Sequence, residues 1–199
     1  MPDKFLNKYR ISSARLPTWD YGSNGAYFLT ICTARRQHYF GVIINSEMQL
    51  SKIGEYATEC WLNIPAHFPY FYLDAFVVMP NHVHGIILIE KPYFVKTRHA
   101  LSLQHVLSPQ QPNSAESQQL EAQSQPPHFR FRNQGKNTIS ATVGSFKSAV
   151  TKLCNENKVP FGWQPRFHDH IIRDKHEFYK IRNYIINNPA NWKQDRFYS

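Results

Sequence analysis

Hydrophobic and polar positions in the first part of the chain change from strand-like to helical spacing. Residues 26–33 are rich in aromatic and β-branched side chains, which are typical of a strand. Between residues 53 and 64 the apolar positions recur every three to four residues, which predicts an amphipathic helix. Ser51 is placed to cap the start of this helix and Pro65 to end it.

The pattern then returns to strands. Residues 72–79 and 82–90 are predicted as two strands joined by a tight turn at Pro80-Asn81. Farther along, apolar residues between 139 and 153 fall at offsets typical of a second amphipathic helix. The order of elements up to this point is β-α-β-β-α.

The last part of the chain completes a known topology. Residues 163–173 are predicted as a strand of mixed polarity, and residues 174–188 as a helix that Pro189 ends. The resulting order is the split β-α-β pattern of the ferredoxin-like fold with one added C-terminal helix. We therefore expect an α+β protein with an antiparallel sheet of about four to five strands.

The composition changes over residues 96–135, where residues 104–125 are rich in Gln, Ser and Pro and cannot bury enough apolar surface to add to a core. We interpret residues 96–135 as a flexible insertion in a single domain that covers residues 1–199.

Composition limits the class of partner. The chain has 23 Lys and Arg against 14 Asp and Glu, a formal net charge of +9, which favours a polyanion, with nucleic acid ahead of an anionic membrane surface. Its 3 cysteines have no C-x-x-C spacing, so neither a disulfide framework nor a cysteine zinc site is indicated. With no apolar run long enough to span a membrane, we expect a cytoplasmic protein.

Two histidine pairs are candidates for metal binding. His82 and His84 are two residues apart on a predicted strand, so both imidazoles face one side and are able to bind one divalent cation. His168 and His170 have the same spacing. Spacing alone does not choose between the pairs, and a structural role for hydrogen-bonded histidines is the alternative for each.

The C-terminal helix carries a second candidate group. Tyr184 and Asn188 are four residues apart and share one helix face. A deprotonated phenol is able to attack phosphorus, and an amide oxygen is able to complete a metal shell. A half-buried aromatic and an ordinary C-terminal residue before proline are the structural alternatives.

These motifs carry a family resemblance. Segment 78–86, which contains Pro80 to Gly85, resembles the histidine-hydrophobic-histidine (HUH) motif. Segment 182–189 resembles the nucleophile helix of the REP-associated tyrosine transposases, and segment 163–173 is similar to the strand before that helix. The resemblance covers nearly all of the chain except the insertion.

The resemblance implies a site and a reaction. His82, His84 and Asn188 match the metal-binding positions for Mg²⁺ or Mn²⁺, and Tyr184 matches the nucleophile. His170 is then structural or faces DNA. The residues that the resemblance and the basic charge together offer for DNA contact are Arg10, Arg15, Arg166, His170 and Arg173.

The implied function is a single-stranded DNA endonuclease and strand transferase that cuts beside hairpins through a 5′-phosphotyrosine. We expect it to act near the nucleoid as a monomer or homodimer. The alternative is a single-stranded nucleic-acid binding protein that has lost cleavage. Histidine-triad hydrolases and amidohydrolase barrels are disfavoured, because position 86 is Ile86 and the chain is too short for a barrel.

Overall fold

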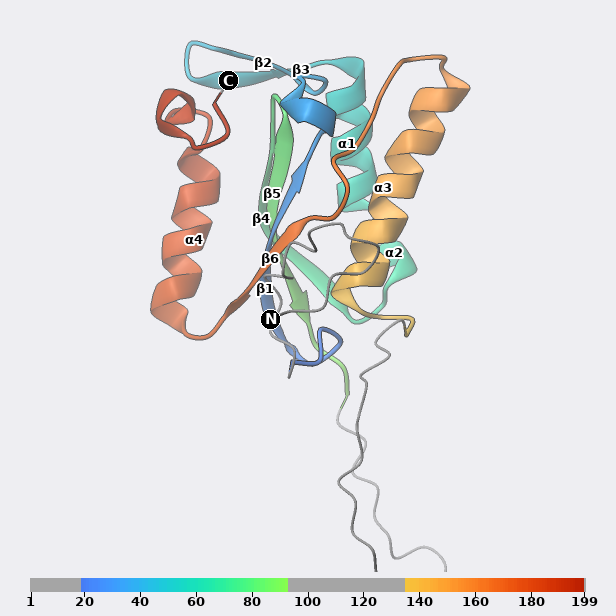
Figure 1. Cartoon of the computed structure of the whole chain (residues 1–199). Helices are drawn as coiled ribbons and strands as arrows, with labels where there is room; N and C mark the ends of the chain where they lie inside the picture. The colour runs from blue at the N-terminus through green and yellow to red at the C-terminus, as the bar shows by residue number, and fades with distance from the viewer. Residues whose placement is uncertain (1–18, 93–134, 199) are drawn as a thin grey trace, which may run out of the picture. The chain divides into compact units, whose positions relative to one another are not determined.

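The main sheet is antiparallel throughout and has the strand order β4-β5-β1-β6 (Figure 1). A computed structural model describes residues 19–92 and 135–198 of the chain. The strands of this sheet are β1 (Gly25–Cys32), β4 (Phe71–Met79), β5 (His82–Ile89) and β6 (His168–Ile172). This order is that of the ferredoxin-like fold, so the predicted fold class is confirmed.

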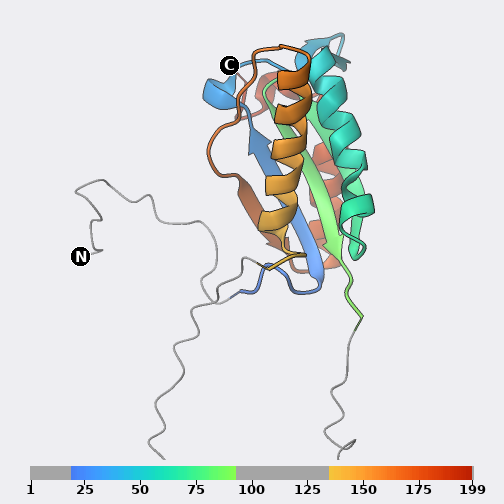
Figure 2. The same cartoon turned by 90° about the vertical axis from the view of Figure 1, so that its right-hand side faces the viewer.

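Helices cover both faces of the sheet. Helices α1 (Lys52–Leu62) and α3 (Ile139–Glu156) lie together on one face, and α4 (Lys175–Asn187) lies alone on the other, as Figures 1 and 2 show. Each begins at a polar cap: the side chains of Ser51, Thr138 and Asp174 accept hydrogen bonds from backbone N–H groups in the first turn.

The two faces of β5 carry different chemistry because side chains alternate along a strand. Val83, Ile87 and Ile89 belong to the large core beneath α1 and α3. Ile86 belongs instead to a smaller cluster with Ile185 of α4. His82 and His84 have the parity of Ile86, so both histidines face the layer that contains α4.

Three local features differ from the sequence prediction. The first helix ends at Leu62, and Pro65 lies in the first turn of a separate short helix, α2 (Ile64–His67), rather than ending the first one. The strand predicted for 163–173 is confined to β6, and Trp163 forms only an isolated bridge with Thr33.

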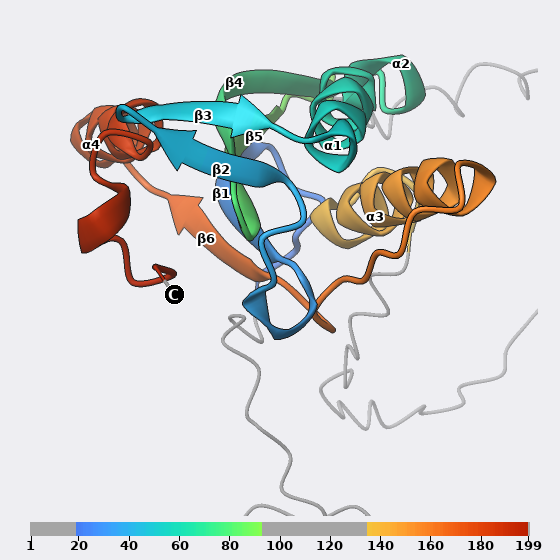
Figure 3. The same cartoon turned by 90° about the horizontal axis from the view of Figure 1, so that it is seen from above.

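A hairpin of β2 (Gly41–Ile44) and β3 (Glu47–Leu50) was not predicted. Figure 3 shows it at the end of the sheet near the C-terminal end of α4. Val42, Ile44 and Leu50 are apolar although they are exposed, so the sequence of β2 lacks the apolar-polar alternation that would have indicated a strand.

The interior of the insertion predicted for 96–135, like Arg10 and Arg15, lies outside the described residues. Within the described ranges, no helix has the length and apolar character needed to cross a membrane.

Candidate metal and nucleophile site

Two histidine side chains lie side by side at the beginning of β5. The rings of His82 and His84 are 4.3 Å apart between centroids, and their residues are 0% and 1% exposed. The adjacent strand β1 pairs Cys32 with His82 and Thr30 with His84, so the sheet fixes the position of both backbones. The first predicted pair is therefore arranged with its side chains on one face.

Hydrogen bonds determine which nitrogen of His82 has a free lone pair for a metal ion. The amide Nδ2 of Asn81 donates to the backbone oxygen of Phe197 over 2.9 Å, which leaves Oδ1 of Asn81 beside the imidazole. That oxygen lies 2.8 Å from Nδ1 of His82 and accepts a hydrogen bond from the Nδ1–H group. Nε2 of neutral His82 then carries a lone pair, and this buried atom has no hydrogen-bond partner among the described residues.

His84 links the histidine pair to the C-terminal helix. Its Nδ1 lies 2.9 Å from the hydroxyl of Thr30, and its Nε2 lies 3.2 Å from the phenol oxygen of Tyr184. A threonine hydroxyl is able either to donate or to accept, so it serves both neutral tautomers of His84.

Asp195 joins Tyr184 to Asn188. Its Oδ2 accepts a hydrogen bond of 2.8 Å from the Tyr184 phenol and one of 2.7 Å from Nδ2 of Asn188. Asn188 is 1% exposed, and its Oδ1 has no partner within the described part of the chain. Tyr184 and Asn188 thus lie on one face of the helix, as their spacing of four residues predicted.

Burial sets the protonation of the site. It lowers the pKa of His82 well below its ordinary value, with a further contribution from the charge of His84. Burial also lowers the pKa of His84 to about 4, against the opposing effect of Asp195. Burial and the hydrogen bond to Asp195 raise the pKa of Tyr184 to about 12. Near pH 7 both imidazoles are neutral and the phenol is protonated.

The donor set fits a divalent cation. Ligand atoms of His82, His84 and Asp195 lie within 4.8 Å of one another. Neutral imidazoles are the form that binds metal, and carboxylate or amide oxygens complete the shells of Mg²⁺ and Mn²⁺. Buried polar atoms without partners are rare in proteins, and Nε2 of His82 and Oδ1 of Asn188 are two of them. A cation bound by the histidine pair would satisfy Nε2 of His82.

The rival pair lies in different surroundings. Nε2 of His170 on β6 forms a 2.7 Å hydrogen bond with Oε1 of Glu177, and the His170 side chain is 43% exposed. His168 is exposed and pairs with Thr30 across the sheet. Among the described residues, neither belongs to the cluster that could hold a metal.

Sequence reasoning missed several residues of this site. Asn81 stands inside the quoted motif and carried a signal, because a polar residue before two histidines is a candidate to orient one of them. Asp195 follows Pro189 at no informative spacing, so nothing in the sequence pointed to it. Arg36 and Arg196 place their guanidinium groups 5.2 and 4.6 Å from the ring centroid of Phe197, which itself packs on His82.

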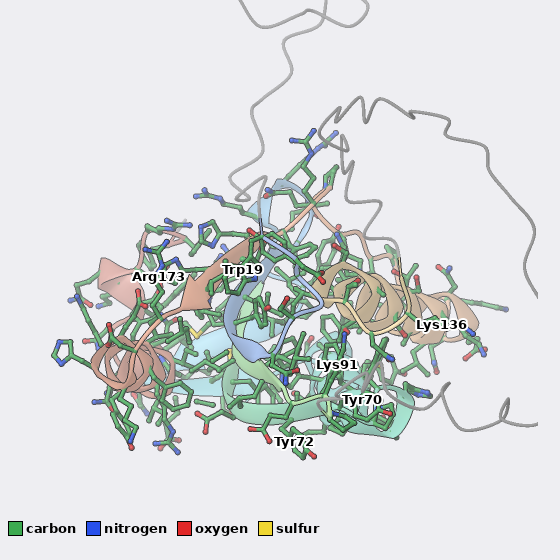
Figure 4. All side chains as sticks on the ribbon, turned by 90° about the horizontal axis from the view of Figure 1, so that it is seen from below. Trp19, Tyr70, Tyr72, Lys91, Lys136 and Arg173 are labelled. Atoms are coloured by element: carbon green, nitrogen blue, oxygen red, sulfur yellow. The ribbon has the colours of Figure 1, made fainter. Side chains whose placement is uncertain are left out.

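The residues predicted to contact DNA lie in several places. Arg166 is exposed in the loop before β6, and its backbone oxygen accepts a hydrogen bond from Lys147. Arg173 precedes α4 at the opposite end of the sheet from His82, where Figure 4 shows it at the same end as Lys91 and Lys136. The roles of Arg10, Arg15, Arg166, His170 and Arg173 stay predictions.

A cavity of about 510 Å³ follows one face of α4 from its beginning to Tyr184. Arg173, His176 and Lys180 line it together with Asp174 and Glu177. The two acidic side chains are engaged locally, since Asp174 caps the helix and Glu177 accepts from His170 and from the backbone of Arg173. The backbone N–H of Arg173 and then His170 lower the pKa of Glu177. The cavity therefore brings two basic side chains, Arg173 and Lys180, together with two hydrogen-bonded carboxylates on the path to the phenol.

Comparison with known proteins places this geometry in context. The solved structure of a REP-associated tyrosine transposase bound to a REP hairpin aligns with a TM-score of 0.55 and 18% identity, covering 94% of this chain and 77% of that one. The chain thus has the fold of the REP-associated tyrosine transposases, as the sequence resemblance predicted.

A Haemophilus influenzae protein described as uncharacterized is 40% identical over 188 residues, which are 94% of this chain and 92% of that protein. The chain belongs to the same family as this protein. No protein-family model matches it.

Proposed function

We propose that this protein is a metal-dependent single-stranded DNA endonuclease and strand transferase that cuts beside hairpins through a 5′-phosphotyrosine. One observation carries the proposal: the phenol of Tyr184 lies 3.2 Å from Nε2 of His84, a nitrogen of the buried histidine pair. A nucleophile next to a metal-binding nitrogen is the arrangement that phosphodiester cleavage through tyrosine requires. The fold shared with a hairpin-bound transposase supports the same reading.

In this proposal His82, His84 and Asn188 hold Mg²⁺ or Mn²⁺, and Tyr184 is the nucleophile. A bound cation would polarise the scissile phosphate and offset negative charge that develops on its oxygens. The tyrosine oxygen attacks phosphorus, the bond to the 3′ oxygen breaks, and a 3′-OH leaves. Because the phosphotyrosine retains the phosphodiester energy, attack by another 3′-OH reverses the step and joins two strands.

The chain supplies the proton transfer through Asp195. With a pKa of about 12, only about one Tyr184 in 10⁵ is deprotonated at pH 7. Asp195 Oδ2 lies 2.8 Å from the phenol and is the atom placed to take its proton. A cation near His84 would lower the cost of that transfer by stabilising the phenolate.

The α4 cavity supports single-stranded DNA as the substrate. Arg173 and Lys180 offer positive charge to phosphates along a path that ends at Tyr184. Arg36 and Arg196 add charge beside the histidines. We propose that the strand follows α4 toward the site, with the protein acting near the nucleoid as a monomer or homodimer.

The test mixes the full chain with labelled hairpin DNA that carries single-stranded flanks, in Mn²⁺ or in EDTA. A protein-DNA adduct on a denaturing gel is expected for wild type in Mn²⁺, and its absence is expected for Tyr184→Phe. Tyr179→Phe is the matched control on the same helix, because Tyr179 is 60% exposed. Salt-sensitive binding without an adduct, across hairpins from the source genome, would favour a binding protein that does not cleave.

A further inference from the structure

Asp195 makes an unusual number of contacts for one side chain at the site. Oδ2 accepts from Asn188 Nδ2 and from the Tyr184 phenol, over 2.7 and 2.8 Å. Oδ1 accepts from the backbone N–H of Phe197 over 2.7 Å. Three donors thus converge on this carboxylate and fix its position within the C-terminal segment.

These contacts determine how Asn188 presents its amide. An ionised carboxylate only accepts hydrogen bonds, so it selects the NH₂ group of the amide and excludes its oxygen. With Nδ2 held by Asp195, Oδ1 of Asn188 is directed elsewhere, into a buried position where no described group donates to it. An amide turned the other way would offer the metal an NH₂ group, which is not a ligand.

Hydrogen bonds orient His82 in a similar way. There the backbone oxygen of Phe197 holds Nδ2 of Asn81, and Oδ1 of Asn81 in turn holds Nδ1 of His82. The outcome is again one buried ligand atom without a partner, Nε2 of His82. Residues 195–197 therefore act on two separate ligand positions through their hydrogen bonds.

We propose that Asp195 is a positioning residue that sets the amide orientation of Asn188 and so presents Oδ1 to the metal. This inference rests on the proposed function, which makes Asn188 a ligand. Direct coordination by Asp195 is the competing arrangement, since its carboxylate also lies within reach of His82 and His84. Coordination would require Asp195 to share oxygens that already accept three hydrogen bonds, whereas Oδ1 of Asn188 is unengaged.

The experiment measures Mn²⁺ affinity of the full chain without DNA, from the paramagnetic resonance signal of free Mn²⁺. Partners that orient a metal ligand typically change affinity by about 10- to 100-fold. We expect Asp195→Asn to weaken Mn²⁺ binding by about that factor and Asn188→Ala to weaken it at least as much. The double variant should bind no more weakly than Asn188→Ala alone. Glu156→Gln, an exposed change of the same kind on α3, should leave affinity unchanged.

A further tenfold loss from Asp195→Asn in the Asn188→Ala background would overturn the proposal in favour of direct coordination. An Asp195→Asn variant with wild-type affinity would overturn it as well. Exchanging the two side chains, Asn188→Asp with Asp195→Asn, provides a second route if the single variant does not fold. The exchanged pair keeps a donor facing a carboxylate, so affinity within about tenfold of wild type is expected. An exchanged pair that folds without binding Mn²⁺ would contradict the idea.

His82→Ala separates this inference from the proposed function. If His82→Ala abolishes Mn²⁺ binding and Asp195→Asn does not weaken it, the metal site stands and the role of Asp195 fails. If both variants weaken Mn²⁺ binding but wild type forms no DNA adduct, the inference stands and strand cleavage fails. Unchanged Mn²⁺ affinity in His82→Ala would overturn both.

Discussion

The phenol oxygen of Tyr184 lies 3.2 Å from Nε2 of His84, so the proposed nucleophile contacts the nitrogen through which His84 would bind a metal. The phenol has one proton and donates it to Asp195 over 2.8 Å. In the tautomer of His84 that carries its proton on Nε2, this N–H donates to the phenol oxygen. Metal binding at Nε2 and this hydrogen bond exclude each other.

Removing the phenol hydroxyl should consequently strengthen metal binding even as it abolishes catalysis. Tyr184→Phe is expected to raise Mn²⁺ affinity by about 2- to 10-fold, the equivalent of one net hydrogen bond. Titration of free Mn²⁺ against wild type, Tyr184→Phe and the control Tyr179→Phe measures it. A weaker affinity in Tyr184→Phe would show that the phenol supports the metal site instead of competing with it.

Acid should destabilise the protein through its buried histidines. His84 has a folded pKa of about 4 and an ordinary unfolded value of about 6.5, so the unfolded chain binds a proton that the folded chain lacks between these pH values. Its contribution to stability is complete above pH 6.5 and is lost as pH falls toward 4. Between pH 7.5 and pH 5 the free energy of unfolding should fall by about 2 kcal/mol from His84, and further from His82.

Urea unfolding in EDTA at several pH values tests this dependence. His84→Gln should flatten the change between pH 7.5 and pH 5. The matched control is His176→Gln, because His176 is exposed on α4. Equal pH dependence in wild type and His84→Gln would show that the acid sensitivity arises elsewhere.

Gly85 allows Trp61 to lie against β5 directly beside the second histidine. A Cβ added at Gly85 would overlap the indole of Trp61, which is 1% exposed and has little space to move. Gly85→Ala should lower the free energy of unfolding by about 1–3 kcal/mol, as overpacked cores do.

Gly144 offers the opposite case, because a Cβ there meets no atom within 4 Å on helix α3. Gly144→Ala should stabilise the protein by about 0.5–1 kcal/mol through helix propensity. Urea unfolding of both variants compares them. A Gly85→Ala variant as stable as wild type would mean that the indole moves without cost.

Ile185 packs helix α4 against the sheet. It is the residue of α4 that is fully buried, and it packs with Ile86 and Ile172, while its neighbour Ile186 is 53% exposed. Ile185→Val should cost about 0.5–1.5 kcal/mol of stability, and Ile186→Val should cost less. Thermal melting measures both, and a larger loss for Ile186→Val would contradict this packing.

The sequence predicted the main sheet because its strands and helices have strong, separate periodicities. The alternation of β5 placed His82 and His84 on one face, and the spacing of four placed Tyr184 and Asn188 together. The β2–β3 hairpin escaped prediction because apolar residues occupy both the exposed and the half-buried positions of β2, so its sequence does not alternate. Asp195 escaped because its role depends on the path of the chain after Pro189, which no local periodicity encodes.

The end of the sheet opposite His82 is better suited to an insertion than the end that holds the histidines. His82 begins β5, and its last residue, Ile89, lies about 23 Å away at the rise of a strand. At that far end Asn24 exchanges two hydrogen bonds with Lys91, and Tyr21 accepts from the backbone of Ile139. Lys91 and Ile139, which flank residues 93–134, are thus both hydrogen-bonded to the turn at residues 21–24, far from His82. Doubling the length of a connection costs only about 0.6 kcal/mol of closure entropy, so a reporter or affinity domain inserted between Lys91 and Ile139 should leave His82 and His84 in their positions.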